Sequence, residues 1–299
     1  MAPIMATLRA ALSRRGSELA ALAAAVLVTL SLGGCAWLDG KQRQLALRPT
    51  PGRPADFTGL RAGDLRFTLP VAATGADRDQ LAIWWLPHAD PNAPTLLYLH
   101  GTFRNLYQNL PKIDALRAAG FAIVAVDYRG WGDSTPIVPS EETIVADAWA
   151  AWAELERWQP VANRRVVFGH SMGGAVAVEL ASRLRHRTDY GALVLESTFS
   201  RMSDVAAAAG FWGRIGAVFT TLEFDALSKI GRVDAPLLML HGADDKTVPI
   251  EVGRRLRDAA PAGVRWIEVP GGSHSRLHSD APALYRQALA ELINAVAAP

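Results

Sequence analysis

The stretch VVFGHSMGGAVAVEL, from Val166 to Leu180, decides the fold. A short apolar run, typical of a buried strand, leads into a helical pattern, and Ser171 stands at the junction. Glycines two positions before and two positions after the serine permit a very sharp turn, because a Cβ there would collide with neighbouring backbone. The turn pushes the hydroxyl into a cleft, so the pattern predicts Ser171 as a nucleophile. A serine that only caps the helix is the structural alternative.

Short apolar runs alternate with helical stretches on both sides of this turn. The helical stretches cover residues 105–119, 141–158, 172–185, 251–259 and 281–298, and the apolar runs between them include TLLYLHG, FAIVAVDYRG, GALVLES, APLLMLHG and VRWIEVP. Alternation of this kind predicts an α/β fold with a mostly parallel, twisted sheet and helices on both faces. LRFTL and LAIWWLP flank a turn and predict a hairpin that forms an antiparallel N-terminal edge.

One connection is longer than a crossover helix requires. About forty residues separate Glu196 from Pro236, and the excess predicts a small helical cap inserted at about 201–233. The folded domain that carries this cap is expected to span residues 64–299.

The charge of the chain excludes one class of partner. Its 299 residues carry a formal net charge of +2 and half of them are hydrophobic. The excess charge lies in the first 34 residues, so the remaining chain is close to neutral and has no basic stripe. Nucleic-acid binding is therefore not expected.

The N-terminus has the layout of a signal peptide. Basic residues precede the apolar run LAALAAAVLVTLSL, which is shorter than a membrane-spanning helix requires, and the run ends at Cys35. The sequence from Leu32 to Cys35 resembles the bacterial lipobox, in which the cysteine is lipidated. We therefore expect a lipoprotein signal peptide over 1–34 and a tether over 35–63. An ordinary buried thiol is the alternative for Cys35.

Lipidation would place the protein in the bacterial cell envelope, attached to a membrane. Ala36 follows the cysteine, and by resemblance to lipoprotein sorting this residue favours the periplasmic face of the outer membrane. The inner membrane remains the alternative.

A serine nucleophile needs a base and a carboxylate that orients the base. Of the seven histidines, His274 and His278 lie in and after a glycine-rich loop that follows the last apolar run, and we favour His274. Asp244 and Asp245 follow the seventh run, and the residues alone do not separate them. The order Ser, Asp, His along the chain is the order used by α/β-hydrolases.

At this point the chain resembles the α/β-hydrolase family, in particular its short-capped serine hydrolases. That group includes monoglyceride-lipase-like, serine-aminopeptidase-like and esterase sequences. The resemblance covers Leu65 to the C-terminus, through LHG, DYRGWGDS, GHSMGG, ESTF, FDALSKI, HGADDKTVP and GGSH. It implies Asp245 as the acid and His274 as the base.

The tetrahedral intermediate of acyl transfer requires two backbone N–H donors. Met172 follows the nucleophile at a helix N-terminus and supplies the first. By resemblance Thr102, after His100 and Gly101, supplies the second, and Phe103 is a possible substitute.

A substrate pocket is expected beside the nucleophile. Its predicted residues are Phe103 and Trp131 from the body with Trp212 and Phe219 from the cap, although the cap aromatics could serve only to attach the cap to the body. The resemblance assigns DYRGWGDS to structure. The sequence shows no His and Cys cluster for a metal and no phosphate-binding loop, so no metal and no cofactor are expected.

These residues predict a lipid-anchored serine hydrolase that cleaves small acyl esters through an acyl-enzyme. Peptidase, thioesterase and acyltransferase activities are alternatives within the fold. A catalytically silent, anchored binding protein is the alternative outside enzymes.

Overall fold

The computed structural model describes residues 34, 37–72, 75, 78–208 and 222–297. Cys35 and the two cap aromatics of the predicted pocket, Trp212 and Phe219, lie outside the described residues. Of the cap, the structure describes helix α5 (Met202–Ala208) and the chain from residue 222 onward. Among the described residues, no helix has both the length and the hydropathy needed to cross a membrane.

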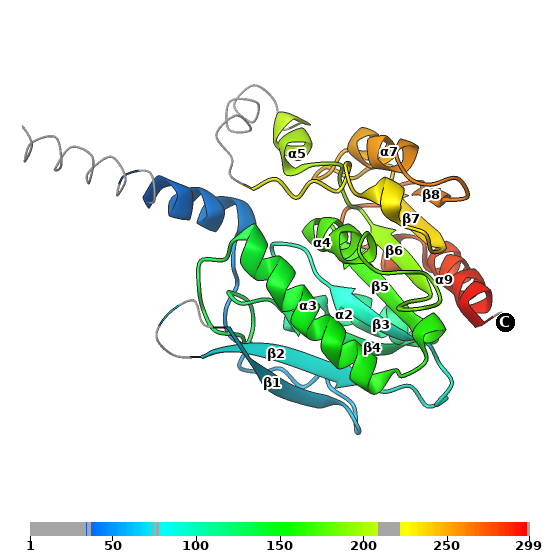
Figure 1. The fold of residues 1–299 in the computed structure, drawn as a ribbon, viewed down its shortest axis with the longest axis horizontal. Helices are drawn as coiled ribbons and strands as arrows, with labels where there is room; N and C mark the ends of the chain where they lie inside the picture. The colour runs from blue at the N-terminus through cyan, green and yellow to red at the C-terminus, as the bar shows by residue number, and fades with distance from the viewer. Residues whose placement is uncertain (1–33, 35–36, 73–74, 76–77, 209–221, 298–299) are drawn as a thin grey trace, which may run out of the picture.

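The sheet has eight strands in the order β1-β2-β4-β3-β5-β6-β7-β8. β1 (Leu65–Val71) and β2 (Asp79–Leu86) form the expected antiparallel hairpin, and β2 also pairs antiparallel with β4 (Ala122–Asp127). The other strands are parallel: β3 (Thr95–Leu99), β5 (Arg165–His170), β6 (Ala192–Glu196), β7 (Leu237–Gly242) and β8 (Arg265–Val269). The predicted fold class, a mostly parallel sheet with an antiparallel N-terminal edge, is confirmed (Figure 1).

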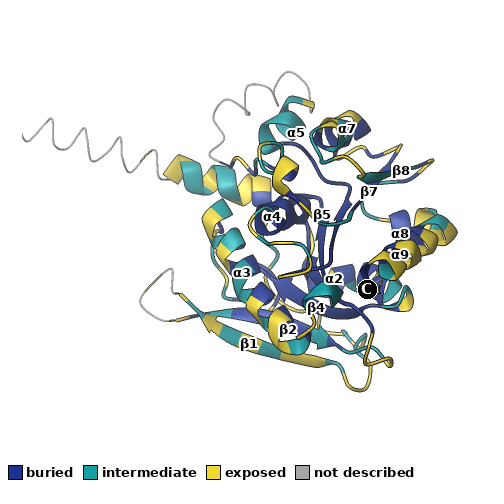
Figure 2. Cartoon of the chain, turned by 45° about the vertical axis from the view of Figure 1, so that its right-hand side comes forward, coloured by how far each residue is buried: buried dark blue, intermediate teal, exposed yellow. Residues whose placement is uncertain are grey.

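Helices cover both faces of the sheet. One apolar layer packs beneath α3 (Glu141–Trp158), α4 (Met172–Ala181) and α7 (Ile250–Asp258), and the other packs beneath α2 (Leu106–Ala118) and α9 (Pro282–Ala297). The central strands are therefore buried on both sides, as Figure 2 shows, which explains their uninterrupted apolar sequences. A short helix, α8 (Leu277–Asp280), precedes α9.

The segment predicted to be a tether is partly ordered against the body. Residues 37–47 are helical, and this helix lies close to the N-terminal end of α3 (Figure 1). Leu47 is fully buried, and Pro51 forms a β-bridge with Gly132. An apolar side chain and two backbone hydrogen bonds between Gly132 and residues 50 and 52 hold this stretch in place. The predicted start of the body at residue 64 therefore lies well inside the packed part of the chain.

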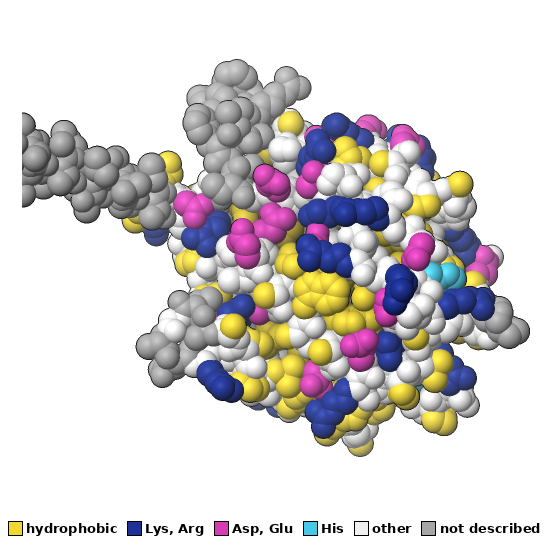
Figure 3. Space-filling model, viewed as in Figure 1, with side chains coloured by type: hydrophobic (Ala, Val, Ile, Leu, Met, Phe, Trp, Pro, Cys, Tyr) yellow, Lys and Arg dark blue, Asp and Glu magenta, His cyan; other side chains and the backbone are white. Residues whose placement is uncertain are grey.

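The surface carries charges of both signs. Figure 3 shows basic and acidic side chains interspersed over the face in view, with apolar side chains between them. This arrangement agrees with the near-neutral charge of the body.

Candidate active site

The strand order determines where a site can form. β3 and β5 are neighbours in the sheet. After β3 the chain crosses to β4 on one side, and after β5 it crosses to β6 on the other side. Loops that diverge in this way leave a crevice at the carboxyl ends of the strands. The loop after β3 and the turn after β5 meet there, since a Cβ built on Gly101 would lie 3.0 Å from the Cβ of Ser171.

Ser171 stands on a strained turn between β5 and α4. Its φ of 54° and ψ of −122° lie in a region that residues with a side chain rarely adopt. A Cβ on Gly169 would come within 2.2 Å of the Gly173 carbonyl oxygen, and one on Gly173 within 2.1 Å of the Leu99 carbonyl oxygen. Both flanking glycines are therefore required by close backbone packing. The backbone N–H of Ser171 donates to the carbonyl of Glu196 at 2.9 Å, which fixes the turn to the next strand.

The three residues predicted for catalysis lie together in space. His274 Nε2 is 3.1 Å from Ser171 Oγ, and His274 Nδ1 is 2.7 Å from Asp245 Oδ2. A carboxylate accepts, so Nδ1 carries the proton and the bare Nε2 is free to accept the proton of the serine hydroxyl. All three side chains are buried. The arrangement can therefore generate a nucleophilic serine alkoxide during attack.

Asp245 is held as a carboxylate by its neighbours. Burial by itself raises its pKa, but the hydrogen bond from His274 and those from the backbone N–H groups of Val248 and Thr247 outweigh burial and hold the pKa below its ordinary value. Both N–H groups donate to Oδ1 at 2.8 Å. The second oxygen is therefore committed to the histidine. The other candidate, Asp244, is exposed.

The two predicted oxyanion donors lie on the segments that adjoin Ser171. Met172 is the first residue of α4, where a backbone N–H has no partner inside the helix. Thr102 lines the cavity beside Ser171, and its carbonyl accepts the indole N–H of Trp131 at 2.7 Å. That bond fixes the plane of the peptide that follows Thr102.

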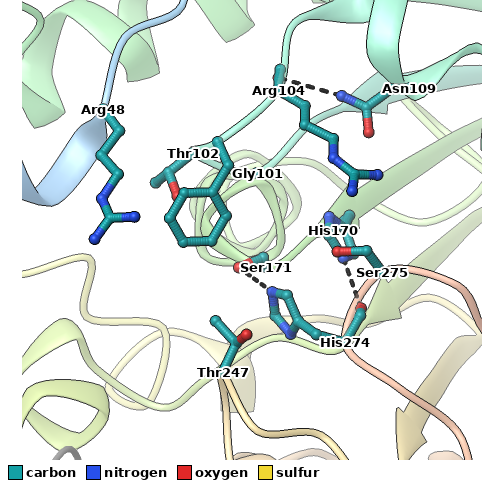
Figure 4. Close-up of a pocket in the computed structure, with 11 residues that line it drawn as sticks. Arg48, Gly101, Thr102, Arg104, Asn109, His170, Ser171, Thr247, His274 and Ser275 are labelled. Atoms are coloured by element: carbon teal, nitrogen blue, oxygen red, sulfur yellow. Dashed lines mark hydrogen bonds between the residues drawn. The ribbon is translucent and has the colours of Figure 1, made fainter.

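A cavity of about 320 Å³ opens over Ser171 (Figure 4). Phe103 lines it and is 43% exposed, in agreement with its predicted position. Trp131 does not line it. Its side chain is fully buried behind the wall that Thr102 forms, because the indole N–H is used to hold that wall.

Several lining residues have no counterpart in the sequence analysis. They are Arg48, Arg104, Asn109, His170, Thr247 and Ser275. Arg48 follows the N-terminal helical segment, and its guanidinium lies 4.9 Å from the centre of the Phe103 ring. The sequence carries no signal for Arg48, because a proline-containing polar stretch predicts a tether whatever it packs against.

His170 directly precedes Ser171, and it was not predicted to belong to the site. Its Nε2 lies 2.9 Å from the carbonyl oxygen of His274, so the ring donates to the loop that carries the base. Burial, and after it the positive charge of Lys112, holds the pKa of His170 well below its ordinary value. A neutral His170 therefore positions His274 without adding charge.

The loop DYRGWGDS is structural, as the resemblance implies. Asp127 accepts the N–H of Leu106 at 2.9 Å, and Arg129 pairs with Asp147 at 2.8 Å and with Asp79 at 2.9 Å. Within the described part of the chain, no group of three or more His, Cys, Asp or Glu side chains is arranged to hold a metal ion.

Comparisons with known proteins identify the family of the chain. An uncharacterized protein of Mycobacterium tuberculosis is 30% identical over 254 residues, which cover 84% of this chain and 86% of that protein. The serine aminopeptidase S33 family model matches residues 90–222. The chain belongs to the α/β-hydrolase family.

Two further proteins that are similar to this chain have named activities. Lysophosphatidylserine lipase ABHD12 of Danio rerio is 30% identical over 209 residues, which cover 64% of this chain and 54% of that protein. An esterase of Pyrococcus furiosus has the same fold, with a TM-score of 0.66 at 18% identity, over 82% of this chain and 96% of that one. The relatives and the family model support a hydrolase of this fold.

Proposed function

We propose that this α/β-hydrolase is a serine hydrolase that cleaves carboxylic esters through an acyl-enzyme on Ser171. One observation carries the proposal. The Ser171 hydroxyl, the His274 ring and the Asp245 carboxylate form a continuous hydrogen-bonded series, with separations of 3.1 and 2.7 Å. The series ends in a cavity that can admit a substrate.

Each step has a residue to perform it. His274 Nε2 takes the proton of Ser171 as Oγ bonds to the ester carbonyl carbon, and the carbonyl oxygen becomes an oxyanion. The backbone N–H groups of Met172 and Thr102 stabilise that oxyanion, with Phe103 as the alternative second donor. When the intermediate collapses, the C–O bond of the ester breaks and the proton on His274 passes to the leaving alcohol. Water then repeats the sequence on the acyl-enzyme and releases the acid.

The acyl group is proposed to be that of a lipid-like ester. The lysophosphatidylserine lipases among the relatives support this class. Trp212 and Phe219 of the cap are proposed to contact the acyl chain. If both are changed to alanine, the preference for acyl length should change.

A direct test uses 4-nitrophenyl esters of increasing acyl length with the wild type and with Ser171→Ala. Hydrolysis that is abolished by the substitution, with fluorophosphonate labelling of Ser171, is the expected result. If neither protein hydrolyses any ester and the probe does not label Ser171, the chain is a silent binding protein. Amino-acid 4-nitroanilides test the second candidate, a peptidase, which the serine aminopeptidase family model favours.

We further propose that the enzyme is exported and anchored to a membrane through a lipid on Cys35. The helical segment that follows the cysteine exposes large apolar side chains, with Trp37 at 65%, Leu38 at 62% and Leu45 at 74% exposure. Side chains of this kind can enter the interfacial layer of a bilayer. Cys35→Ala should abolish incorporation of labelled palmitate and release the protein from the membrane fraction. Palmitate label that persists in this variant contradicts the anchor.

A further inference from the structure

A second hollow adjoins the catalytic cavity. It has a volume of about 250 Å³ and shares Arg104, Asn109 and Ser275 with the cavity over Ser171. Figure 4 shows Arg104 reaching from the loop after β3 toward His170 and Ser275, while Arg48 stands across Ser171 from it. Ser275 directly follows the base, so the hollow lies on the side of the site where His274 returns its proton.

The charge of this hollow is positive. Arg104 and Arg276 line it, whereas no carboxylate does so among the described residues. Lys112 also lines it, but this ammonium is buried and paired with Glu196. Arg276 is 68% exposed and lies 3.8 Å from Asp280. Arg104 has no ion-pair partner in the described part of the chain, so its charge is available to a ligand.

An unpartnered ring nitrogen marks the same place. His278 lines the hollow, and its buried Nδ1 has no hydrogen-bond partner among the described residues. Buried polar atoms are normally paired in folded proteins, and this nitrogen is an exception. The hydroxyl of Ser275, which lines the same hollow, adds a donor. The hydroxyl of Ser279 also lines the hollow, but it already donates to the Arg276 carbonyl at 3.0 Å.

We infer that the hollow lined by Arg104, Ser275, Arg276 and His278 binds a phosphate group in the alcohol half of the substrate. The inference rests on the proposed ester hydrolysis. Two guanidinium groups with the neighbouring hydroxyl of Ser275 match the several acceptor oxygens of a phosphate. The leaving alcohol departs beside His274, which places its substituents next to Ser275 and Arg104. The acyl half then extends to the opposite side of Ser171.

The test measures binding and hydrolysis separately, with the full chain in detergent. Binding is measured by calorimetry with two ethers that cannot be hydrolysed, 1-O-octylglycerol 3-phosphate and 1-O-octylglycerol. Hydrolysis is measured with the corresponding octanoyl esters. Arg104→Gln should lower the preference for the phosphate-bearing compound about ten-fold or more in both assays, as expected for lost charge-assisted hydrogen bonds.

Matched variants distinguish a phosphate site at Arg104 from a general effect of positive charge on the protein surface. Arg286→Gln, an exposed arginine of α9 that does not line either hollow, should change nothing. Arg276→Gln should lower the preference less than Arg104→Gln, since Arg276 is largely exposed. Arg48→Gln removes the same charge across Ser171. An equal loss in this variant, or an unchanged preference in Arg104→Gln, overturns the inference.

The two proposals fail in different ways. Binding of the phosphate ether that depends on Arg104, in a protein that hydrolyses neither ester and is not labelled at Ser171, supports the phosphate site and refutes the esterase. Hydrolysis of both esters, with no preference for phosphate in the wild type, refutes the phosphate site and supports the esterase. Melting curves identify any variant that is not folded, and Arg276→Gln then decides between the outcomes.

Discussion

His170 Nε2 lies 2.9 Å from the carbonyl oxygen of His274. The residue next to the nucleophile therefore supports the loop of the base, over a separation of 104 positions in the sequence. The contact joins the end of β5 to the loop after β8, which are not neighbouring strands. A change in His170 should consequently alter the distance between Ser171 and His274.

The first prediction concerns that contact. His170→Gln keeps a side-chain N–H donor for the His274 carbonyl, whereas His170→Phe removes it. We expect His170→Phe to reduce kcat about ten-fold or more, because a small displacement of a catalytic group is costly, and His170→Gln to retain most of kcat. The rate of fluorophosphonate labelling of Ser171 should follow the same order. Equal rates for the two variants would show that the contact has no positioning role.

The same histidine should affect stability as the pH falls. Its folded-state pKa is lowered by burial and by Lys112, so below about pH 6.5 the unfolded chain binds a proton that the folded protein does not bind. The free energy of unfolding therefore falls as the pH falls. His170→Gln should reduce the slope by up to about 1.4 kcal/mol per pH unit between about pH 6.5 and 5. Urea titrations across this range measure it, and an unchanged slope contradicts the assignment.

Asp245→Asn should lower kcat by about 10⁴, the size of effect known for the same change in another triad. Asp245 Oδ1 accepts two backbone N–H groups, so the oxygen of the introduced amide remains there and its NH₂ faces His274 Nδ1. His274 must then carry its proton on Nε2, where it cannot accept the proton of Ser171. Asp244→Asn, one residue away and exposed, is the control and should leave kcat unchanged.

Local patterns predicted the fold and most of the three residues that the structure brings together, whereas the choice of Asp245 over Asp244 came from the family resemblance. Alternating strands and helices determine the parallel sheet, and Ser171, Asp245 and His274 each follow a strand whose end is recognisable in the sequence. Trp131 was wrongly predicted to line the pocket. The sequence pattern of an aromatic residue near a strand end is the same whether its side chain faces a cavity or packs behind the loop that lines it. Arg48 and His170 were missed because their roles depend on contacts with distant segments. Such contacts leave no periodic signal.

Gly173→Ala should prevent normal folding. The added Cβ would lie 2.1 Å from the Leu99 carbonyl oxygen, which belongs to β3 and cannot move without disrupting the sheet. We expect a loss of about 3 kcal/mol or more in the free energy of unfolding. Gly231→Ala is the matched control, since its Cβ would lie 3.6 Å from the nearest atom, the Ala259 carbonyl oxygen. A Gly173→Ala protein with wild-type stability would show that the turn has room for a Cβ beside the Leu99 carbonyl oxygen.

Lys112→Met should lower the free energy of unfolding by about 3–5 kcal/mol, because it leaves the buried carboxylate of Glu196 without its cation. Glu196 is fully buried, and apart from Lys112 it retains the hydroxyl of Tyr285, which donates at 2.8 Å. Arg183→Met provides the control at an ion pair whose cation is exposed. Arg183 is 62% exposed, and its partner Glu179 keeps Lys229 at 2.7 Å. Chemical denaturation should show a change of less than about 1 kcal/mol for this control.

The N-terminal segment should be required for activity as well as for attachment. Asn105, which caps α2 after the Thr102 loop, donates through Nδ2 to the carbonyls of Thr50 at 3.1 Å and Gly52 at 2.9 Å. The Thr50 hydroxyl also donates to the Phe103 carbonyl at 3.2 Å. A protein that starts at residue 53 lacks these contacts. Its kcat/KM should fall about ten-fold or more relative to a protein that starts at residue 36, because the Thr102 loop loses its support.

Point variants separate the contribution of packing from that of the loop. Leu47 is fully buried, so Leu47→Ala in the protein that starts at residue 36 should cost about 2–5 kcal/mol. Leu45, two residues earlier, is 74% exposed, and Leu45→Ala should stay within about 0.5 kcal/mol of the wild type. If the protein that starts at residue 53 matches the longer one in stability and in kcat/KM, residues 47–52 are only a tether. If stability and kcat/KM both fall, residues 47–52 are part of the enzyme. The Thr102 loop beside Ser171 then depends on a segment that precedes the first strand.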